Sequence, residues 1–389
     1  MINIRFILIL IIGIISFSIT TESVYVWSMT GGNAAHTYHA NFNSPSAVNW
    51  KIETKTNNSA LFNVAVWNNL VYITFSNRIQ AYNTNNGSLI WDQMLLGRYD
   101  VNNGGSLAVG MNSIVYVVNR ADFNSSNLTA IDGQTGTIKW KKSAQQFYRH
   151  HFIDPCYFTD PVIDLIRNVV YVFCNDRLLG FNGDDGSINW QFQLNEDMAD
   201  SPAPTIDHDQ IIIFYDSDNI YAINLDTKVI TWKLNNPILE TSYLPVYQNR
   251  VYVQVSNSIL ILDLLTGKRL NEFLVPDNSL SISNLLPIND HLAYIPTTSG
   301  LVQYNIITGK SLISIDYLDA LIYLINNQSS IYSYCHNNDY SKYGLCTIDG
   351  NIGKTSNIFE FPINYNNLAP DIDGNMIILG TDGSLSSIS

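Results

Sequence analysis

The fold is decided by one stretch, Ala130-Ile131-Asp132-Gly133-Gln134-Thr135-Gly136-Thr137-Ile138-Lys139-Trp140, because its skeleton returns along the chain. That skeleton is a small residue, an Asp or Asn two positions later, a Gly four positions further, and a Trp eight positions after the Asp or Asn. The strong copies are Ala81/Asn83/Gly87/Trp91, Gly180/Asn182/Gly186/Trp190 and Ala222/Asn224/Lys228/Trp232. The weaker copies are Ile261/Asp263/Gly267/Asn271, Gln303/Asn305/Gly309/Ile313 and Thr347/Asp349/Gly353/Asn357. A periodic array of this kind indicates a repeat architecture.

The spacing of the repeat identifies the unit. Successive Asp or Asn positions lie 49, 50, 42, 39, 42 and 44 residues apart, and a four-stranded propeller blade is about 40–50 residues long. Short β-branched and aromatic runs such as 114–118 and 169–173 precede these positions, as is typical of strands. No sustained 3.6-residue apolar period follows the N-terminal segment, so an α/β fold is not expected. The sequence therefore predicts an all-β chain built as a β-propeller.

The repeat also shows paired changes of side-chain volume. Four tryptophans follow a small residue by ten positions, in the pairs Ala81 and Trp91, Ala130 and Trp140, Gly180 and Trp190, and Ala222 and Trp232. Where the Trp is replaced, at positions 271, 313 and 357, the small residue is replaced as well. Packed interiors tolerate little change of volume. We therefore expect each indole to lie against the small residue of the adjacent strand.

The two ends of the sequence contain the halves of an eighth unit. Residues 385–389 align with residues 128–132, and the chain stops at the Asp position. Residues 47–50 supply the missing Trp50, whose small partner is then Ser387. We expect an eight-bladed β-propeller closed by pairing of the N- and C-terminal strands, which protects edge strands from pairing with other chains.

The Ala-x-Asp-x-x-x-Gly-x-x-x-Trp unit resembles the tryptophan-docking motif of the quinoprotein alcohol dehydrogenase-like β-propellers, and residues 27–37 resemble the opening of many such domains. The family includes pyrroloquinoline quinone (PQQ) dehydrogenases and non-catalytic outer-membrane assembly lipoproteins. The dehydrogenases carry an adjacent cysteine pair, a carboxylate base and calcium ligands, and these cannot be placed on this sequence. The resemblance is closer to the non-catalytic type, and it supports neither PQQ nor calcium as a cofactor.

The acidic clusters of the sequence are expected to be turn residues. Asp184, Asp185, Asp216 and Asp218 fall in predicted hairpin turns, where Asp is favoured for backbone reasons. Residues 371–374 lack the remaining positions of an EF-hand loop. No Ser/His/Asp or Cys/His set can be identified. We therefore assign no catalytic, cofactor-binding or metal-binding residue.

The N-terminal residues are expected to direct the chain to the secretory pathway. Residues 1–20 contain Arg5 and then an apolar run over 6–15. This run is short for a spanning helix, which needs about 20 residues, so we expect a cleaved signal peptide. Residues 24–389 would form a single domain in the extracellular space or the endolysosomal lumen, with no transmembrane segment in the mature chain.

The net charge limits the kinds of partner that the protein can bind, and the sequence contains several possible glycosylation sites. A net charge of −13 disfavours nucleic acid and anionic membranes as primary partners, and leaves a protein or glycan partner of unknown identity. Asn-x-Ser/Thr sequons fall in predicted loops or turns, where a glycan can project into water. They are Asn57, Asn86, Asn124, Asn127 and Asn327.

One face of the predicted propeller gathers the irregular segments, at 97–105, 119–127, 143–158 and 336–342. Within it a candidate binding loop is rich in residues that anchor interfaces. It comprises Phe147, Tyr148, Arg149, His150, His151 and Phe152. The alternative is that these aromatic side chains cover the blade core. We expect a secreted, non-catalytic binding or scaffold module, with a quinone-dependent oxidoreductase as the alternative.

The four cysteines give the first testable prediction. In an oxidising compartment we expect the local pairs Cys156–Cys174 and Cys335–Cys346, because the members of each pair fall on strands or loops that are neighbours in the predicted blade. A zinc site with nearby histidines is the rival interpretation, although the spacings fit no standard ligand pattern. Peptide mapping without reduction should recover both pairs. Free thiols, or a link between the two regions, would contradict the predicted strand order.

Overall fold

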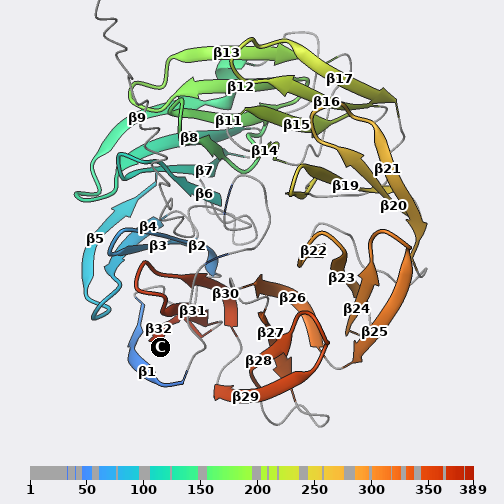
Figure 1. Ribbon diagram of the computed structural model, residues 1–389. Coiled ribbons are helices and arrows are strands. Elements are labelled where there is room, and N and C mark those ends of the chain that lie inside the picture. The colour runs from blue at the N-terminus through green and yellow to red at the C-terminus, as the bar shows by residue number, and fades with distance from the viewer. Residues whose placement is uncertain are drawn as a thin grey trace, which may run out of the picture.

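The computed structural model describes residues 33, 40, 46–54, 61–75, 78–95, 106–122, 125–147, 156–194, 203–207, 210–216, 219–235, 244–255, 258–275, 285–297, 300–316, 318–325, 330–336, 343–361, 365–380 and 382–389. These residues form eight four-stranded sheets and one short 3-10 helix, η1 (Ala144–Phe147). No helix in this part of the chain is long and apolar enough to cross a membrane. The all-β prediction is confirmed, and the sheets are those of a β-propeller (Figure 1).

The first four sheets follow one another along the chain. The first is β2 (Leu61–Trp67), β3 (Leu70–Phe75), β4 (Arg78–Asn83) and β5 (Leu89–Met94). The second is β6 (Ser106–Val109), β7 (Ile114–Asp122), β8 (Ser125–Asp132) and β9 (Ile138–Ser143). The third is β10 (Val162–Asp164), β11 (Val169–Cys174), β12 (Arg177–Asn182) and β13 (Ile188–Gln193). The fourth is β14 (Thr205–Asp207), β15 (Ile211–Tyr215), β16 (Asn219–Asn224) and β17 (Ile230–Asn235).

The other four sheets complete the set. The fifth is β18 (Val246–Tyr247), β19 (Arg250–Val255), β20 (Ser258–Asp263) and β21 (Arg269–Leu274). The sixth is β22 (Leu286–Pro287), β23 (Leu292–Thr297), β24 (Gly300–Asn305) and β25 (Lys310–Asp316). The seventh is β26 (Leu318–Ile325), β27 (Ser330–His336), β28 (Tyr343–Asp349) and β29 (Thr355–Phe361). The eighth is β30 (Tyr365–Pro370), β31 (Met376–Gly380), β32 (Ser384–Ile388) and β1 (Val48–Glu53).

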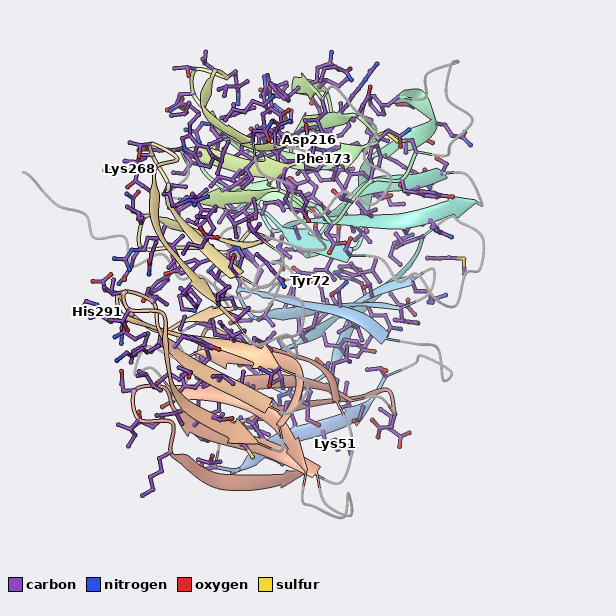
Figure 2. The ribbon with its side chains drawn as sticks, turned by 90° about the vertical axis from the view of Figure 1, so that its right-hand side faces the viewer. Lys51, Tyr72, Phe173, Asp216, Lys268 and His291 are labelled. Carbon is purple, nitrogen blue, oxygen red and sulfur yellow. A yellow bond between two sulfur atoms is a disulfide. The ribbon has the colours of Figure 1, made fainter. Side chains whose placement is uncertain are left out.

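Each sheet is an antiparallel meander, and this defines two faces of the molecule. The turns between first and second strands, and those between third and fourth strands, open on one side, which we call the turn face. The turns between second and third strands, and the connections between sheets, lie on the other side, the loop face. In Figure 2 Lys268 and His291, which belong to two different turns of the turn face, lie on the same side of the molecule.

The eighth sheet is assembled from both ends of the described chain. β1 pairs antiparallel with β32, from Val48 opposite Ile388 to Glu53 opposite Ser384. Trp50 lies opposite Ser387. This sheet therefore contains a Trp and a small partner in the same register as the sheets whose four strands are consecutive.

One expected loop is instead a hairpin. Residues 119–127 were expected to be irregular, but β7 and β8 continue through most of this stretch, with Asn119 opposite Asn127 and Asp122 opposite Ser125. Backbone pairing satisfies the N–H and C=O groups of a buried segment. Asn119 and Asn127 are both only 4% exposed in this hairpin.

Each tryptophan of the repeat lies opposite its small residue and also reaches the next sheet. Ala81 lies opposite Trp91, and Ala130 lies opposite Trp140. The indole of Trp91 also covers Gly136 of the following sheet, where an added Cβ would lie 2.8 Å from the ring. Trp140 covers Gly186 in the same way, at 2.7 Å. The glycine of the neighbouring sheet thus provides the space that receives the indole ring.

A hydrogen bond accompanies this docking contact. Four of the five motif indoles donate their N–H to the carbonyl that follows the motif Asp or Asn of the next sheet. The bonds run from Trp50 to Thr84, Trp91 to Gly133, Trp140 to Gly183 and Trp232 to Leu264, at 2.7, 2.7, 2.8 and 2.7 Å. Every bond therefore joins two neighbouring sheets at the same place in the repeat.

Two of the three degenerate repeats keep this bond with a different donor. Asn271 stands in the Trp position, and its Nδ2 donates to the carbonyl oxygens of Ile306 and Ile307 at 2.5 and 3.0 Å. In the next sheet the Trp position is Ile313, which has no donor. There Gln303, in the small-residue position, donates from Nε2 to the carbonyl oxygen of Gly350 at 2.8 Å. The change of volume in these repeats is therefore also an exchange of hydrogen-bond donor.

A buried tyrosine underlies the docking contact in most sheets. The second strands contain Tyr72, Tyr116, Tyr171, Tyr252, Tyr294 and Tyr332, all under 2% exposed. Tyr72 lies opposite Ala81, and its hydroxyl is so close to Gly133 that an added Cβ there would lie 2.5 Å from it. Burial raises the pKa of Tyr294 to about 12, so its hydroxyl stays protonated and accepts a hydrogen bond from Gln303 at 3.0 Å.

Removing a docking indole should be costly. Trp140 is only 8% exposed and contacts both its own and the next sheet, so Trp140→Ala should lower the free energy of unfolding by about 3–5 kcal/mol. The equivalent position of a degenerate repeat, Asn357, should tolerate Asn357→Ala at a cost of under about 1 kcal/mol. Denaturant unfolding of the two variants measures the difference. Equal losses would mean that the indole makes no special contact.

Removing the Gln303 amide, which donates in place of an indole, should also destabilise the fold. Gln303→Leu keeps the size of the side chain but leaves the buried carbonyl of Gly350 and the hydroxyl of Tyr294 without this partner. We expect it to lower the free energy of unfolding by about 1–3 kcal/mol. Ile261→Leu, at the same position of the preceding sheet, is a matched change without a hydrogen bond and should cost less than about 1.5 kcal/mol. If Gln303→Leu were neutral or stabilising, the amide would not replace the indole donor.

Candidate functional site

A disulfide braces the loop face between two sheets. Cys156 and Cys174 are bonded, as the sequence predicted, with their Cα atoms 5.5 Å apart. Cys174 ends β11, whereas Cys156 lies ahead of β10 and forms a parallel bridge with Ser125 of β8. The disulfide therefore links the third sheet to a strand of the second.

The chain after Cys156 is held by further contacts of the same kind. The backbone N–H of Phe158 donates to Oγ of Ser126 in β8 at 2.6 Å, and Phe158 forms an antiparallel bridge with Cys174. Thr159 Oγ1 accepts the N–H of Phe173 at 3.0 Å. The stretch from 156 to 159 is thus fixed to both neighbouring sheets before β10 begins.

Phe147 is the only residue of the candidate binding loop within the described chain. It ends η1 and packs against Phe158 and Phe181, with ring centroids 6.0 and 5.7 Å away. Its half-buried ring therefore covers the blade core, which is the alternative interpretation for this one side chain. Tyr148, Arg149, His150, His151 and Phe152 lie outside the described residues, and their role stays a prediction.

An aromatic–cation pair borders the braced segment, and sequence reasoning missed it. The guanidinium carbon of Arg120 lies 4.7 Å from the ring centroid of Tyr157. Arg120 comes from β7 and Tyr157 follows Cys156, so no local spacing could have brought them together. Both side chains are half-buried. The pair places a positive charge and an aromatic surface beside the disulfide.

The acidic residues considered in the sequence close turns. Asp185 Oδ1 accepts the N–H of Ser187 at 2.8 Å, and Asp371 Oδ1 accepts the N–H of Asp373 at 2.9 Å. Asp216 accepts the N–H of Asn219 and the hydroxyl of Tyr221, at 2.7 Å each. Burial raises the pKa of Asp371, although the turn hydrogen bonds oppose this. Within the described ranges, no three His, Cys, Asp or Glu side chains gather so that they could hold a metal ion.

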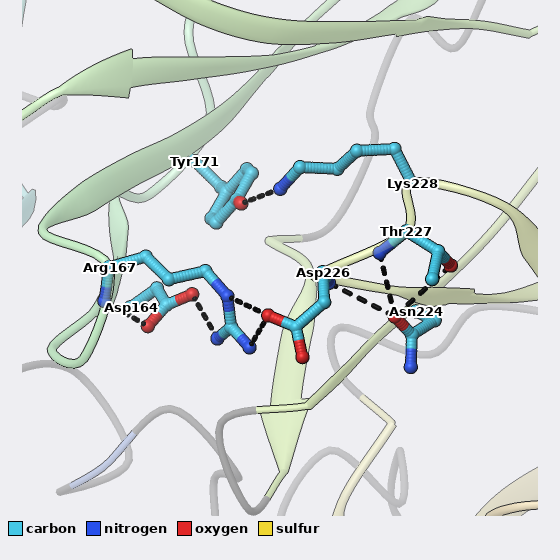
Figure 3. A network of polar contacts seen from close by, with 7 residues as sticks. All are labelled: Asp164, Arg167, Tyr171, Asn224, Asp226, Thr227 and Lys228. Carbon is cyan, nitrogen blue, oxygen red and sulfur yellow. Dashed lines mark hydrogen bonds and ion pairs between the residues drawn. The ribbon is translucent and has the colours of Figure 1, made fainter.

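A polar network replaces the usual docking contact between the third and fourth sheets (Figure 3). Arg167, in the turn after β10, donates from Nη1 to Asp164 at 2.9 Å and from Nε to Asp226 of the fourth sheet at 2.9 Å. Asp164 is fully buried, and Asp226 is exposed in the turn before β17. An ion pair of this kind joins the turn faces of neighbouring sheets.

Lys228 completes this network in the position that other repeats give to glycine. Its backbone has φ +61°, and its ammonium lies 5.2 Å from the ring centroid of Trp190 and 3.3 Å from the hydroxyl of Tyr171. Burial, reinforced by Arg167, lowers the pKa of Lys228. At this interface a cation thus lies over the indole where the other interfaces have a bare glycine.

The second cysteine pair and the glycosylation sequons can be compared with the structure only where their residues are described. Cys346 is disulfide-bonded, whereas the side chain of Cys335 lies outside the described residues, so that pairing stays a prediction. Asn86 is exposed in a turn. Asn127, expected in a loop, lies instead in β8 and is buried, because the hairpin extends through it; a glycan could not project from there. Asn57, Asn124 and Asn327 lie outside the described residues.

Comparisons with known proteins show which family the repeat region resembles. Residues 75–235, which include the four consecutive Trp repeats, match the family model described as outer membrane protein assembly factor BamB. No curated protein matches the chain.

Several solved structures share the fold. BamB from Moraxella catarrhalis is 14% identical, with a TM-score of 0.60, over 88% of this chain and 99% of that one. A europium-containing methanol dehydrogenase is 12% identical, with a TM-score of 0.63, over 92% and 89%. Quinohemoprotein alcohol dehydrogenase from Comamonas testosteroni is 10% identical, with a TM-score of 0.63, over 94% and 80%. Identities this low show the fold alone. The chain therefore has the PQQ-like repeat β-propeller fold that its repeat predicted, and residues 75–235 carry the sequence signature of that family.

Proposed function

We propose that the protein is a secreted, non-catalytic β-propeller that acts as a binding or scaffold module. Its eight sheets form a ring that the pairing of β1 with β32 closes. Its recognition surface lies on the loop face beside the Cys156–Cys174 disulfide and includes the candidate loop at 148–152. The partner is a protein or a glycan, and the site lies in the extracellular space or the endolysosomal lumen.

The observation that carries this proposal is the way the flanks of that loop are built. On one side Phe147 packs into the core, and on the other Cys156 and Phe158 are fixed to β8 and β11. Function is concentrated in loops that a rigid scaffold positions. The residues between these anchors are aromatic, basic and imidazole side chains, which are common in interface hot spots. The Arg120–Tyr157 pair extends the same chemistry onto the described surface.

The motif residues support a scaffold rather than a reaction site. The tryptophans and glycines of the repeat dock neighbouring sheets, and its Asp and Asn residues cap turns, as when Asp132 Oδ1 accepts the N–H of Thr135 at 2.9 Å. Asp185, Asp216 and Asp371 are engaged in the same way. The most regular polar groups of the chain are thus used to build the ring.

Partner capture with matched variants tests the recognition surface. The immobilised protein is exposed to secreted and endolysosomal fractions beside two variants, Tyr148→Ala/Arg149→Ala on the loop face and Asn85→Ala/Gln134→Ala on the turn face. The melting temperatures of all three proteins are measured first, so that a loss of binding can be distinguished from a loss of folding. Only the loop-face variant should lose the partner. Loss in both variants, or in neither, would place recognition elsewhere.

The second candidate is a quinone-dependent oxidoreductase, which the likeness to two dehydrogenase structures favours. Absorption spectra of the purified protein mixed with PQQ and calcium separate the two functions. A scaffold should leave the quinone spectrum unchanged after removal of free cofactor. A stoichiometric bound quinone would favour the oxidoreductase.

Ring closure can be tested apart from binding. Deletion of residues 385–389 removes most of β32 and the partner strand of β1. The exposed edges should lower the melting temperature or cause aggregation. A melting temperature equal to that of the full chain would rule out closure by these strands.

A further inference from the structure

The contact between the third and fourth sheets, which we call the third seam, lacks a bond that joins other neighbouring sheets. Trp190 is the motif indole on this seam, and no residue that the structure describes accepts a hydrogen bond from its N–H. The carbonyl oxygen in the acceptor position, on Leu225, has no donor among these residues either. At the fourth seam, between the fourth and fifth sheets, Trp232 donates to the carbonyl of Leu264 at 2.7 Å. The motif indole therefore bonds across the fourth seam but not across the third.

Lys228 explains why the indole of the third seam is not docked. It stands in the glycine position of the repeat with φ +61°, a backbone conformation that side chains other than glycine rarely adopt. At the equivalent Gly267 of the fourth seam, an added Cβ would lie only 2.6 Å from the ring of Trp232. A Cβ at this position and a docked indole thus exclude each other. Accordingly Trp190 meets Tyr171 at an interplanar angle of 78°, whereas the tyrosine–tryptophan pairs of the first two sheets meet at 40° and 41°.

Charged side chains hold the turn-face end of the third seam instead (Figure 3). Arg167 of the third sheet donates to Asp226 of the fourth at 2.9 Å, and we call this pair the latch. The side chain of Asp226 is 67% exposed. Exposed ion pairs contribute little to stability and are screened by salt. A hydrogen bond to a buried carbonyl is therefore replaced here by a contact for which water competes.

The loop-face end of the same seam is packed by aromatic rings. Phe173 and Phe192 of the third sheet lie 5.3 and 5.7 Å from Phe214 of the fourth, measured between ring centroids. Phe192 also lies 5.9 Å from Tyr221. These four residues are close to the strand ends that border the loop face. Aromatic pairs stabilise a contact beyond the area that they bury, so the firm contacts are at one end of the seam and the exchangeable ones at the other.

We propose that the third seam is a hinge, with its pivot at the aromatic rings of the loop face and its opening end at the latch on the turn face. The Cys156–Cys174 disulfide ties the third sheet to the second, so these two sheets move together against the fourth. Local opening occurs where few buried contacts must be broken. Opening leaves the strands of each sheet paired but exposes the turn-face part of the seam, which includes Leu225.

Thiol labelling of two matched cysteine variants tests the hinge. Leu225→Cys and Leu264→Cys replace leucines at equivalent positions of the repeat, and both leucines are 1% exposed. They belong to the apolar clusters that cross the third and the fourth seam. Each full-length variant is treated with a maleimide under native conditions, and mass spectrometry of the peptides separates the new thiol from the native cysteines. Leu225→Cys should label at least about tenfold faster, because global unfolding exposes both thiols alike and the hinge exposes only one.

Substitutions at the seam test its parts. In the Leu225→Cys background, Asp226→Asn removes the latch and should raise the labelling rate about two- to fivefold. Lys228→Gly removes the Cβ that excludes the indole and should lower the rate about tenfold, the effect of one typical hydrogen bond. Lys228→Asn is the matched control, because Asn tolerates a positive φ but keeps a Cβ, and it should not lower the rate. None of the three should change the labelling of Leu264→Cys.

A second measurement needs no new cysteine. Lys228→Gly in the otherwise unchanged protein should raise the melting temperature, because it relieves the positive φ and admits the indole. A lower melting temperature would overturn the hinge. So would equal labelling of the two cysteine variants, an unchanged rate with Asp226→Asn, or a Lys228→Asn variant that slows labelling as much as Lys228→Gly. No partner is present in these experiments, so their outcome is independent of the proposed recognition surface.

Discussion

The contact on which the structure depends is the docking of an indole from one sheet onto a glycine turn of the next. Trp91 covers Gly136 and hydrogen-bonds Gly133, so one side chain contributes both apolar contact and a polar bond to a neighbouring sheet. A four-stranded sheet alone buries little apolar surface, and repeat proteins gain stability from contacts between neighbours. Contacts of this kind recur from sheet to sheet and fix how neighbouring sheets pack.

The degenerate repeats show which part of the contact is under the stronger constraint. Asn271 and Gln303 both supply a donor for the carbonyl after the motif Asp or Asn, although these repeats have no indole. An unpaired buried carbonyl costs about 1–3 kcal/mol, whereas lost apolar volume can be filled by a neighbouring side chain. Lys228 shows a third solution, in which a cation lies over the indole and an ion pair holds the turns.

The sequence predicted the strand pairing well because it is local. Ten-residue spacing brings Ala130 opposite Trp140 within one hairpin, and Cys156 and Cys174 are separated by only 18 residues. Contacts between sheets were harder to predict, because they join residues more than thirty positions apart. Whether two such residues meet depends on how neighbouring sheets pack. The indole donor bonds and the stacking of Arg120 on Tyr157 belong to this class. The buried tyrosines could have been found from their recurrence in the second strand of most repeats.

The central claim is that the indole is coupled to the glycine of the next sheet. A double-mutant cycle with Trp91→Ala and Gly136→Ala measures that coupling directly, because the three atoms nearest an added Cβ at Gly136 all belong to Trp91. An alanine at position 136 is strained by the positive φ of 74°, but this strain is the same whether residue 91 is Trp or Ala, so it cancels in the cycle. We predict that Gly136→Ala destabilises the wild type by at least about 1 kcal/mol more than it destabilises Trp91→Ala, as contacting residues show in such cycles. Additive effects of the two substitutions would contradict the docking account.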